Sequence, residues 1–243
     1  PEALAGLALA DLMRAYKAVA TGMTDFGPVV DGVVVPHQPF SAASVALSGD
    51  KPLIMGDMDT EAALFLSGRR EALTALARLA RAVGQDTADR LVGAIEAHRP
   101  GIGPYELAVQ VVSDGIFAGP TRAGAEARAT GAHAPTWRYR NLLRTAAMDG
   151  ALMSPHELDV ALTFGNIEAA AGLNGGTPET HEVSRVLRAT WAAFARSGDP
   201  ANATIPTWPA YDGERRVLLI SPTPRVADGD VDGAALAVAG GLS

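Results

Sequence analysis

Three short strand-like segments separated by helical sequence constrain the fold of this chain most strongly. Lys51-Pro-Leu-Ile-Met-Gly56 is apolar and ends at a glycine, which is typical of a buried strand. Residues 137–143 alternate large and polar side chains, and residues 216–221 form a further run, which we expect to be the final strand. Because strands that alternate with helices pair side by side beneath those helices, the sequence predicts a mostly parallel α/β sheet.

Helical patterns occupy most of the remaining chain. The expected helices cover about residues 1–20, 71–83, 87–97, 104–112, 120–130 and 180–196. Leu7, Leu12 and Tyr16 are expected to anchor the first of them. The last one carries Val183 and Leu187 at helical spacing, together with Trp191 and Phe194, and Gly198 ends it.

One segment near the N-terminus predicts a different structure. In residues 28–36 two β-branched runs flank Asp31-Gly32, a pair suited to the type I′ turn of a β-hairpin. We therefore expect a hairpin there.

Composition limits the possible functions. The formal charge of −7 and the scattered arginines give no phosphate-tracking surface, so we predict no nucleic-acid partner. The chain has no cysteine, which excludes disulfides and thiolate zinc sites and fits a reducing compartment. No apolar run approaches the roughly 18–20 residues of a membrane span. We expect a cytoplasmic protein, while a signal upstream of Pro1 leaves secretion open.

No metal or cofactor site is predicted. None of the five histidines belongs to an H-E-x-x-H zinc motif, since His156 has Val160 four residues on. Residues 228–233 match the opening of a calcium loop, but Ala239 occupies the position of the bidentate glutamate. We interpret this segment as a polar turn.

His156 is the most informative single residue. It directly follows the pair Ser154-Pro155, which favours a loop, and an apolar run closing in Phe164-Gly-Asn166 comes after it. Imidazole titrates near neutrality, so a histidine on a loop suits general-base chemistry, although a surface histidine would give the same local pattern. No Gly-x-Ser-x-Gly motif, which carries the nucleophile in α/β-hydrolases, occurs in the 243 residues.

Several segments taken in order resemble the type-B carboxylesterases, the family of cholinesterases and bacterial para-nitrobenzyl esterases. They are Phe26-Gly-Pro-Val-Val-Asp-Gly32 with Pro36, Pro52-Leu-Ile-Met-Gly56 with Glu61-Ala-Ala-Leu-Phe65, Ser113-Asp114 to Glu126, His156 to Asn166, and Trp191-Ala-Ala-Phe194 to Tyr211. The resemblance covers nearly the whole chain. It implies that residues 1–243 are the C-terminal portion of a single α/β-hydrolase domain, with later strands of the sheet and covering helices.

The resemblance also implies a site. Hydrolases of this fold run nucleophile, acid, histidine along the chain, so Glu61 and His156 would be the acid and the base of a Ser-Glu-His triad. Asp57 and Asp59 compete with Glu61, because either could lie at the same strand end. The serine and the oxyanion hole would come from an N-terminal half, encoded by the same gene or supplied as a separate chain, and the substrate would be a small-molecule ester.

Two other functions remain open. An inert esterase-like adhesion or scaffold domain would share the fold, and such domains often lose the acid or the histidine. A free-standing small-molecule binding module is the other possibility.

Asp114 is expected to be buried and hydrogen-bonded, because an unpaired buried carboxylate is costly. Trp191 and Trp208 are expected to lie in the core.

Overall fold

A four-stranded sheet forms the centre of the computed structural model, which describes residues 2–19, 27–66, 73–74, 76–78, 80–81 and 84–228. The strands lie in the order β1 (Leu53–Met58), β2 (Thr136–Asn141), β3 (Val217–Ile220) and β4 (Arg225–Ala227). The first three are parallel, and β4 runs antiparallel to β3. The mostly parallel α/β sheet is thus confirmed. The expectation that the strand at 216–221 is the last one is wrong, since β4 follows it.

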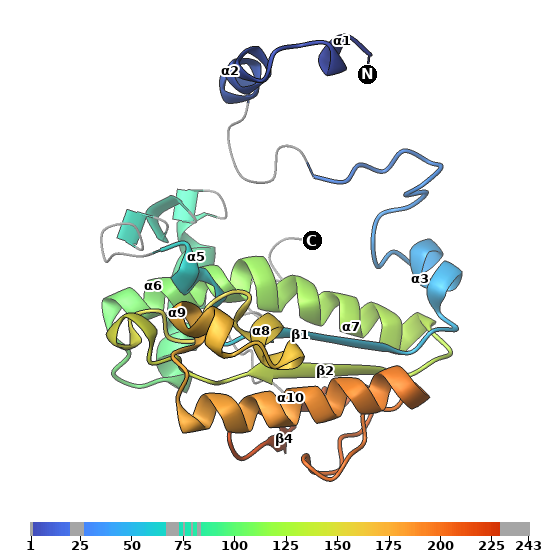
Figure 1. Ribbon diagram of the computed structural model, residues 1–243, viewed down its shortest axis with the longest axis vertical. Helices are drawn as coiled ribbons and strands as arrows, with labels where there is room; N and C mark the ends of the chain where they lie inside the picture. The colour runs from blue at the N-terminus through green and yellow to red at the C-terminus, as the bar shows by residue number, and fades with distance from the viewer. Residues whose placement is uncertain are drawn as a thin grey trace.

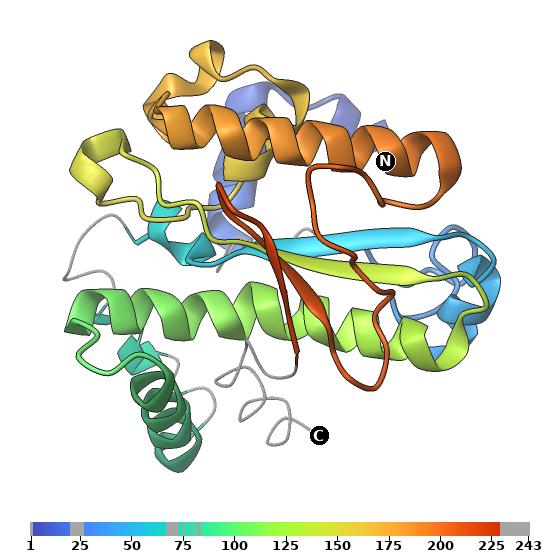
Figure 2. The ribbon, with the colours of Figure 1, turned by 90° about the horizontal axis from the view of Figure 1, so that it is seen from below.

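Helices cover both faces of the sheet. One face carries α8 (Leu158–Phe164) and the long α10 (Pro178–Ser197), and the other carries α7 (Gly119–Gly131), as Figure 2 shows. The predicted helices at 87–97, 104–112 and 120–130 are confirmed as α5 (Gln85–His98), α6 (Pro104–Ser113) and α7. A π-helical segment, η2 (Asp114–Ala118), joins α6 directly to α7.

Shorter elements complete the described chain. They are α1 (Glu2–Ala5), α2 (Leu9–Val19), α3 (Ala42–Ser48), η1 (Glu61–Leu64), η3 (Ala147–Gly150), η4 (Glu168–Ala170) and α9 (Ala171–Asn174). The predicted helix at 71–83 falls largely outside the described residues, as does the acidic segment after Asp228. In the described part of the chain, no helix is both long and apolar enough to cross a membrane.

The main hydrophobic core lies between the sheet and α10. Trp137 and Tyr139 of β2 project into it, where Val183 and Leu187 of α10 are fully buried. Trp208 belongs to the same core, as predicted, whereas Trp191 is only partly buried and packs against the core from the side. Thr177 caps α10 with its side chain and Gly198 ends it at φ 75°, a left-handed backbone that glycine adopts readily.

The opposite face of β2 is buried but charged. Arg138 and Arg140 are 1% and 2% exposed, although the alternating sequence could equally have placed them in solvent. Arg138 donates to Asp57 at 2.9 Å, and Arg140 donates to Asp114 at 2.7 Å. Asp59 lies 3.5 Å from Arg140. The expectation that Asp114 is buried and hydrogen-bonded is confirmed, and these charges are buried because they neutralise one another.

Two expectations near the N-terminus are wrong. Residues 28–36 form no hairpin; instead the Asp31 carboxylate accepts hydrogen bonds from the backbone of residues 33, 34 and 35 and closes a tight turn. This side-chain turn takes up the amide groups that strand pairing would need. Leu7, Leu12 and Tyr16 do not anchor a helix either, since they are 44%, 37% and 42% exposed and Leu7 lies between α1 and α2. Figure 1 shows α1 and α2 standing away from the rest of the fold.

Two surfaces of the described chain are left uncovered: the apolar face of α2 and one edge of β1. The apolar residues of α2 lie at helical spacing and are all exposed, at Leu9, Leu12, Met13, Tyr16 and Val19. Strand β1 pairs only with β2 within the described residues, so its other edge is open. Natural edge strands are usually blunted by charge, proline or a bulge; β1 carries the charged residue Asp57, which pairs with Arg138 inside the fold, and Pro52 directly precedes the strand.

The charged face of β2 gives a stability prediction. Replacing Arg140→Ala leaves buried carboxylates uncompensated, and we expect a loss of about 3–5 kcal/mol in the free energy of unfolding, measured by urea denaturation. The control is Arg185→Ala, which removes an exposed, solvent-screened ion pair with Glu182 and should lower the free energy of unfolding far less. Equal losses in the two variants would contradict the assignment of Arg140 as a structural charge.

Candidate active site

Glu61 and His156 meet where two neighbouring parallel strands end. Glu61 opens η1, three residues after the last residue of β1. His156 lies in the loop that follows β2 and precedes α8. Because β1 and β2 run in the same direction, their carboxyl ends lie at the same edge of the sheet, and the loops after them face each other.

Two hydrogen bonds join these residues. The His156 Nδ1 atom lies 2.6 Å from Glu61 Oε2, and the His156 backbone N–H donates to the Glu61 carbonyl at 3.1 Å. The other carboxylate oxygen of Glu61 accepts the N–H of Met58 at 2.8 Å. Both oxygens of Glu61 are therefore engaged, and its orientation is fixed from the backbone of β1 and from the imidazole.

The two loops are also linked just before the functional side chains, through Thr60, one residue before Glu61, and Ser154, two residues before His156. Thr60 N–H donates to the Ser154 carbonyl at 3.1 Å, and Ser154 N–H donates to Thr60 Oγ1 at 2.7 Å. The Ser154 hydroxyl in turn donates to the carbonyl of Asn141 at the end of β2. All three residues are buried. This buried set of bonds holds the histidine loop against the start of η1.

The competing carboxylates point elsewhere. Asp57 pairs with the buried arginines of β2, on the face of the sheet that α7 covers. Asp59 accepts a hydrogen bond from Arg99 at 2.5 Å and also lies near Arg140. Of the three acidic side chains considered from the sequence, Glu61 is the one that contacts His156.

Aromatic rings flank the imidazole. The ring centroids of Phe65 and Phe117 lie 5.5 Å and 5.0 Å from that of His156, and the two phenyl rings stack on each other at 6.4 Å. The His156 side chain is 35% exposed. The described residues give Nε2 no hydrogen-bond partner, so this atom is available to a reacting group while Nδ1 is held by Glu61.

The surroundings of Glu61 shift its protonation. Burial raises the pKa of the Glu61 carboxyl, because the charged form loses hydration. The Met58 N–H and the His156 imidazole oppose this shift, and the nearby Asp159 carboxylate adds to it. With Glu61 ionised, His156 Nδ1 carries the proton of the bond between them, and Nε2 is then the basic nitrogen.

This arrangement has two of the three parts of a nucleophilic hydrolase. An imidazole held in one tautomer by a buried carboxylate can accept a proton at Nε2 and return it to a leaving group. The fold belongs to the α/β-hydrolase class. It is identified by the mostly parallel sheet, the order of its strands and the position of the Glu61–His156 pair just beyond the carboxyl ends of β1 and β2. The nucleophile motif of that class does not occur in the sequence.

Comparison with known proteins identifies the family. The model of the carboxylesterase family matches residues 3–234, so the chain belongs to the carboxylesterase family, of the type-B kind. It is 25% identical over 225 residues to the para-nitrobenzyl esterase of Bacillus subtilis and 31% identical over 137 residues to the phenmedipham hydrolase of Pseudarthrobacter oxydans. A solved carboxylesterase of Geobacillus stearothermophilus superposes with a TM-score of 0.76 at 25% identity.

The chain spans about half or less of the length of these relatives. The matches cover 88% of this chain but 43% of the para-nitrobenzyl esterase, and 54% of this chain but 27% of the phenmedipham hydrolase. The superposition on the solved carboxylesterase covers 97% of this chain and 50% of that one.

Sequence reasoning missed the aromatic pair beside His156. Phe65 and Phe117 each stand in a segment that resembles the family, but 51 residues lie between them; Phe65 directly follows η1, and Phe117 belongs to η2. Their contact depends on the packing of α6 against η1, which brings η2 to the site. No local pattern in the sequence encodes that packing.

The raised pKa of Glu61 gives a prediction on stability and pH. A carboxyl whose pKa is higher in the folded than in the unfolded state stabilises the fold below its ordinary pKa, near 4.5, and this contribution is lost as the pH rises through the folded value. The free energy of unfolding of the wild type should therefore fall relative to that of Glu61→Gln as the pH increases above 4.5. Denaturant unfolding at a series of pH values measures the difference.

Glu179 provides a control of opposite sign. Hydrogen bonds at the start of α10, first of all with its own backbone N–H, lower the pKa of Glu179, so its contribution is present above its ordinary pKa and is lost as the pH falls. The wild type should thus gain stability over Glu179→Gln with rising pH. Parallel curves for wild type and Glu61→Gln would show that Glu61 is not desolvated in the folded protein.

Proposed function

We propose that this chain supplies the acid and the base of a carboxylic ester hydrolase, and that another portion of the same esterase fold supplies the serine and the oxyanion hole. The observation that carries the proposal is the 2.6 Å contact between Glu61 Oε2 and His156 Nδ1 at the carboxyl ends of β1 and β2. Family membership supports the ester bond as the bond that is cleaved.

The roles follow from the geometry. His156 Nε2 takes the proton of the serine hydroxyl as the oxygen attacks the ester carbonyl, and then gives that proton to the departing alkoxide. A water molecule then attacks the acyl-enzyme in the same way: His156 Nε2 takes its proton and gives it to the serine oxygen as the carboxylate product leaves. Glu61 holds the imidazole in the tautomer that leaves Nε2 basic, and its charge stabilises the imidazolium. The missing catalytic parts are thus a hydroxyl near Nε2 and donors for the oxyanion.

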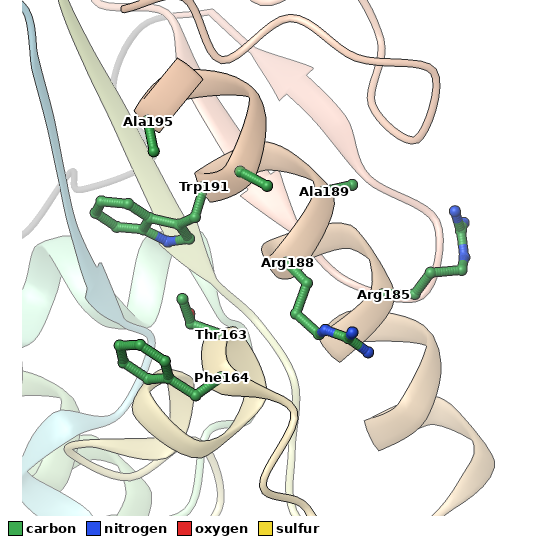
Figure 3. Close-up of a pocket in the computed structure, with 8 residues that line it drawn as sticks. Thr163, Phe164, Arg185, Arg188, Ala189, Trp191 and Ala195 are labelled. Atoms are coloured by element: carbon green, nitrogen blue, oxygen red, sulfur yellow. The ribbon is translucent and has the colours of Figure 1, made fainter.

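The open surfaces support a partner portion of the fold. A strand that added to the free edge of β1 in the parallel direction would place its carboxyl end beside the ends of β1 and β2, next to His156. A groove of about 680 Å³ runs between α8 and α10 and is lined mainly by apolar atoms, among them those of Phe164, Trp191 and Ala192. Figure 3 shows both rings on the same side of α10 and Arg185 on the far side. An apolar helix of the partner portion fits such a groove.

The substrate is a small-molecule ester. Phe65 and Phe117 place apolar surface beside the imidazole, so an apolar acyl or alkoxy group would be in contact with them. Two relatives bear names that indicate a para-nitrobenzyl ester and phenmedipham as substrates. An activated aryl ester is therefore a suitable first probe.

The proposal is tested with residues 1–243 alone and with the same residues joined to the serine-bearing portion of the esterase. We expect hydrolysis of a para-nitrophenyl ester and labelling by a fluorophosphonate only in the joined protein. In that protein, His156→Ala and Glu61→Gln should each lower kcat by about 10⁴-fold or more, because catalytic groups that act as a unit fail together.

His98→Ala is the matched control. His98 is exposed at the end of α5, where its Nδ1 contacts the carbonyl of Ala94, and its loss should leave kcat unchanged. Stoichiometric labelling of the 243 residues alone would overturn the division of the triad. Full activity of His156→Ala in the joined protein would overturn the assigned base.

A further inference from the structure

We propose that Asp159 is a positioning residue for the His156 imidazole, acting through the hydroxyl group of Tyr139. The inference deepens the proposed function, on which it rests for the role of His156. Asp159 lies in the first turn of α8, three residues after His156, and Tyr139 lies in the middle of β2. The Tyr139 hydroxyl donates to Asp159 Oδ2 at 2.6 Å.

The Tyr139 ring is a rigid base for this bond. Tyr139 is the register partner of Gly56 in β1, and a Cβ atom built on Gly56 would come within 2.5 Å of the ring. The ring therefore lies directly over the glycine, in space that a side chain at position 56 would fill. The indole of Trp191 meets the ring edge-on, with centroids 6.5 Å apart. Tyr139 itself is only 5% exposed, so its hydroxyl has a fixed place above the sheet.

The start of α8 depends on such an anchor. Its N-cap residue, Glu157, has a left-handed backbone with φ 65° and caps the helix with no side-chain hydrogen bond. Leu158 and Leu162 bury the inner side of α8, and apolar contacts of this kind are non-directional. The Ser184 hydroxyl of α10 donates to the Leu162 carbonyl at 2.6 Å, but this bond lies near the C-terminal end of α8, away from His156. The short polar bond from the sheet to Asp159 restrains the N-terminal end of α8, and the peptide units from 156 to 159 transmit that orientation to the histidine.

The bond has a defined polarity. Burial, and then the neighbouring Asp159, hold the pKa of Tyr139 well above its ordinary value near 10, so the phenol stays protonated and donates. A carboxylate acceptor makes such a bond shorter and about twice as strong as one between neutral groups. Asp159 also raises the pKa of Glu61, which indicates that its charge is felt at the site it is proposed to position.

A proton signal reports the position of His156 without any need for a nucleophile. The proton between His156 Nδ1 and Glu61 should appear far downfield in the ¹H NMR spectrum of the 243-residue chain, and a chain with five histidines allows its assignment by ¹⁵N correlation. In Tyr139→Phe and in Asp159→Asn we expect this proton to move upfield and to exchange with solvent about tenfold faster, as the loss of one charge-assisted bond implies. Asp159→Glu keeps a carboxylate and should restore part of the protection.

Tyr211→Phe is the matched control. Tyr211 is buried on the other side of the sheet, beside Ala125 and Val217, so this variant also loses a buried phenol hydroxyl but should leave the His156 signal unchanged. In the joined esterase, Tyr139→Phe and Asp159→Asn should lower kcat about tenfold with KM unchanged, because they disturb the base and not the substrate contacts.

The outcomes separate this inference from the proposed function. An unchanged downfield proton in both variants, with only thermal stability lowered, would overturn the positioning role and leave the Glu61–His156 pair intact. The absence of the downfield proton in the wild type would overturn the pair itself, and the positioning role with it. A shifted and faster-exchanging proton in Tyr211→Phe as well would show a general loosening of the fold and would also overturn the specific role of Asp159.

Discussion

Parallel pairing of β1 with β2 is the constraint on which the candidate site depends. It brings the carboxyl ends of two strands together that are separated by more than 70 residues in the chain, so the loops after them share one edge of the sheet. The loops after the two strands therefore bring Glu61 and His156 into contact. The buried hydrogen bonds between Thr60 and Ser154 hold these two loops together. The 2.6 Å contact is thus a product of strand register first and of side-chain chemistry second.

Pairing in this register also buries charged side chains on one face of β2. One side of β2 is apolar and faces α10, while the other carries Arg138 and Arg140 into a space that α7 and η2 close. Asp57 and Asp114 neutralise these charges. Ion pairs of this kind add little net stability but are costly in any other register, because a slip by one residue would bury unmatched charges. The network therefore specifies how β1, β2 and the helices around them align.

Much of this architecture could be predicted from the sequence, for identifiable reasons. The strands and the helices α5, α6, α7 and α10 carry strong local signals, in apolar runs, prolines at first turns and the glycine at 198. The segment at 28–36 was mispredicted because the Asp31 side chain competes with strand pairing. Patterning could not distinguish Glu61 from its neighbours Asp57 and Asp59 either. That choice depends on where buried arginines lie, and they come from a distant part of the chain.

Gly56, which has no side chain, links the interior of the sheet to the start of α8 through the ring of Tyr139. Because the phenol ring rests on Gly56, any enlargement at that position has to be met by a smaller residue at 139. The smaller residue would lack the hydroxyl that reaches α8. Sequence drift in the interior of the sheet is thereby linked to the histidine loop, and the two positions should vary together across related esterases or not at all.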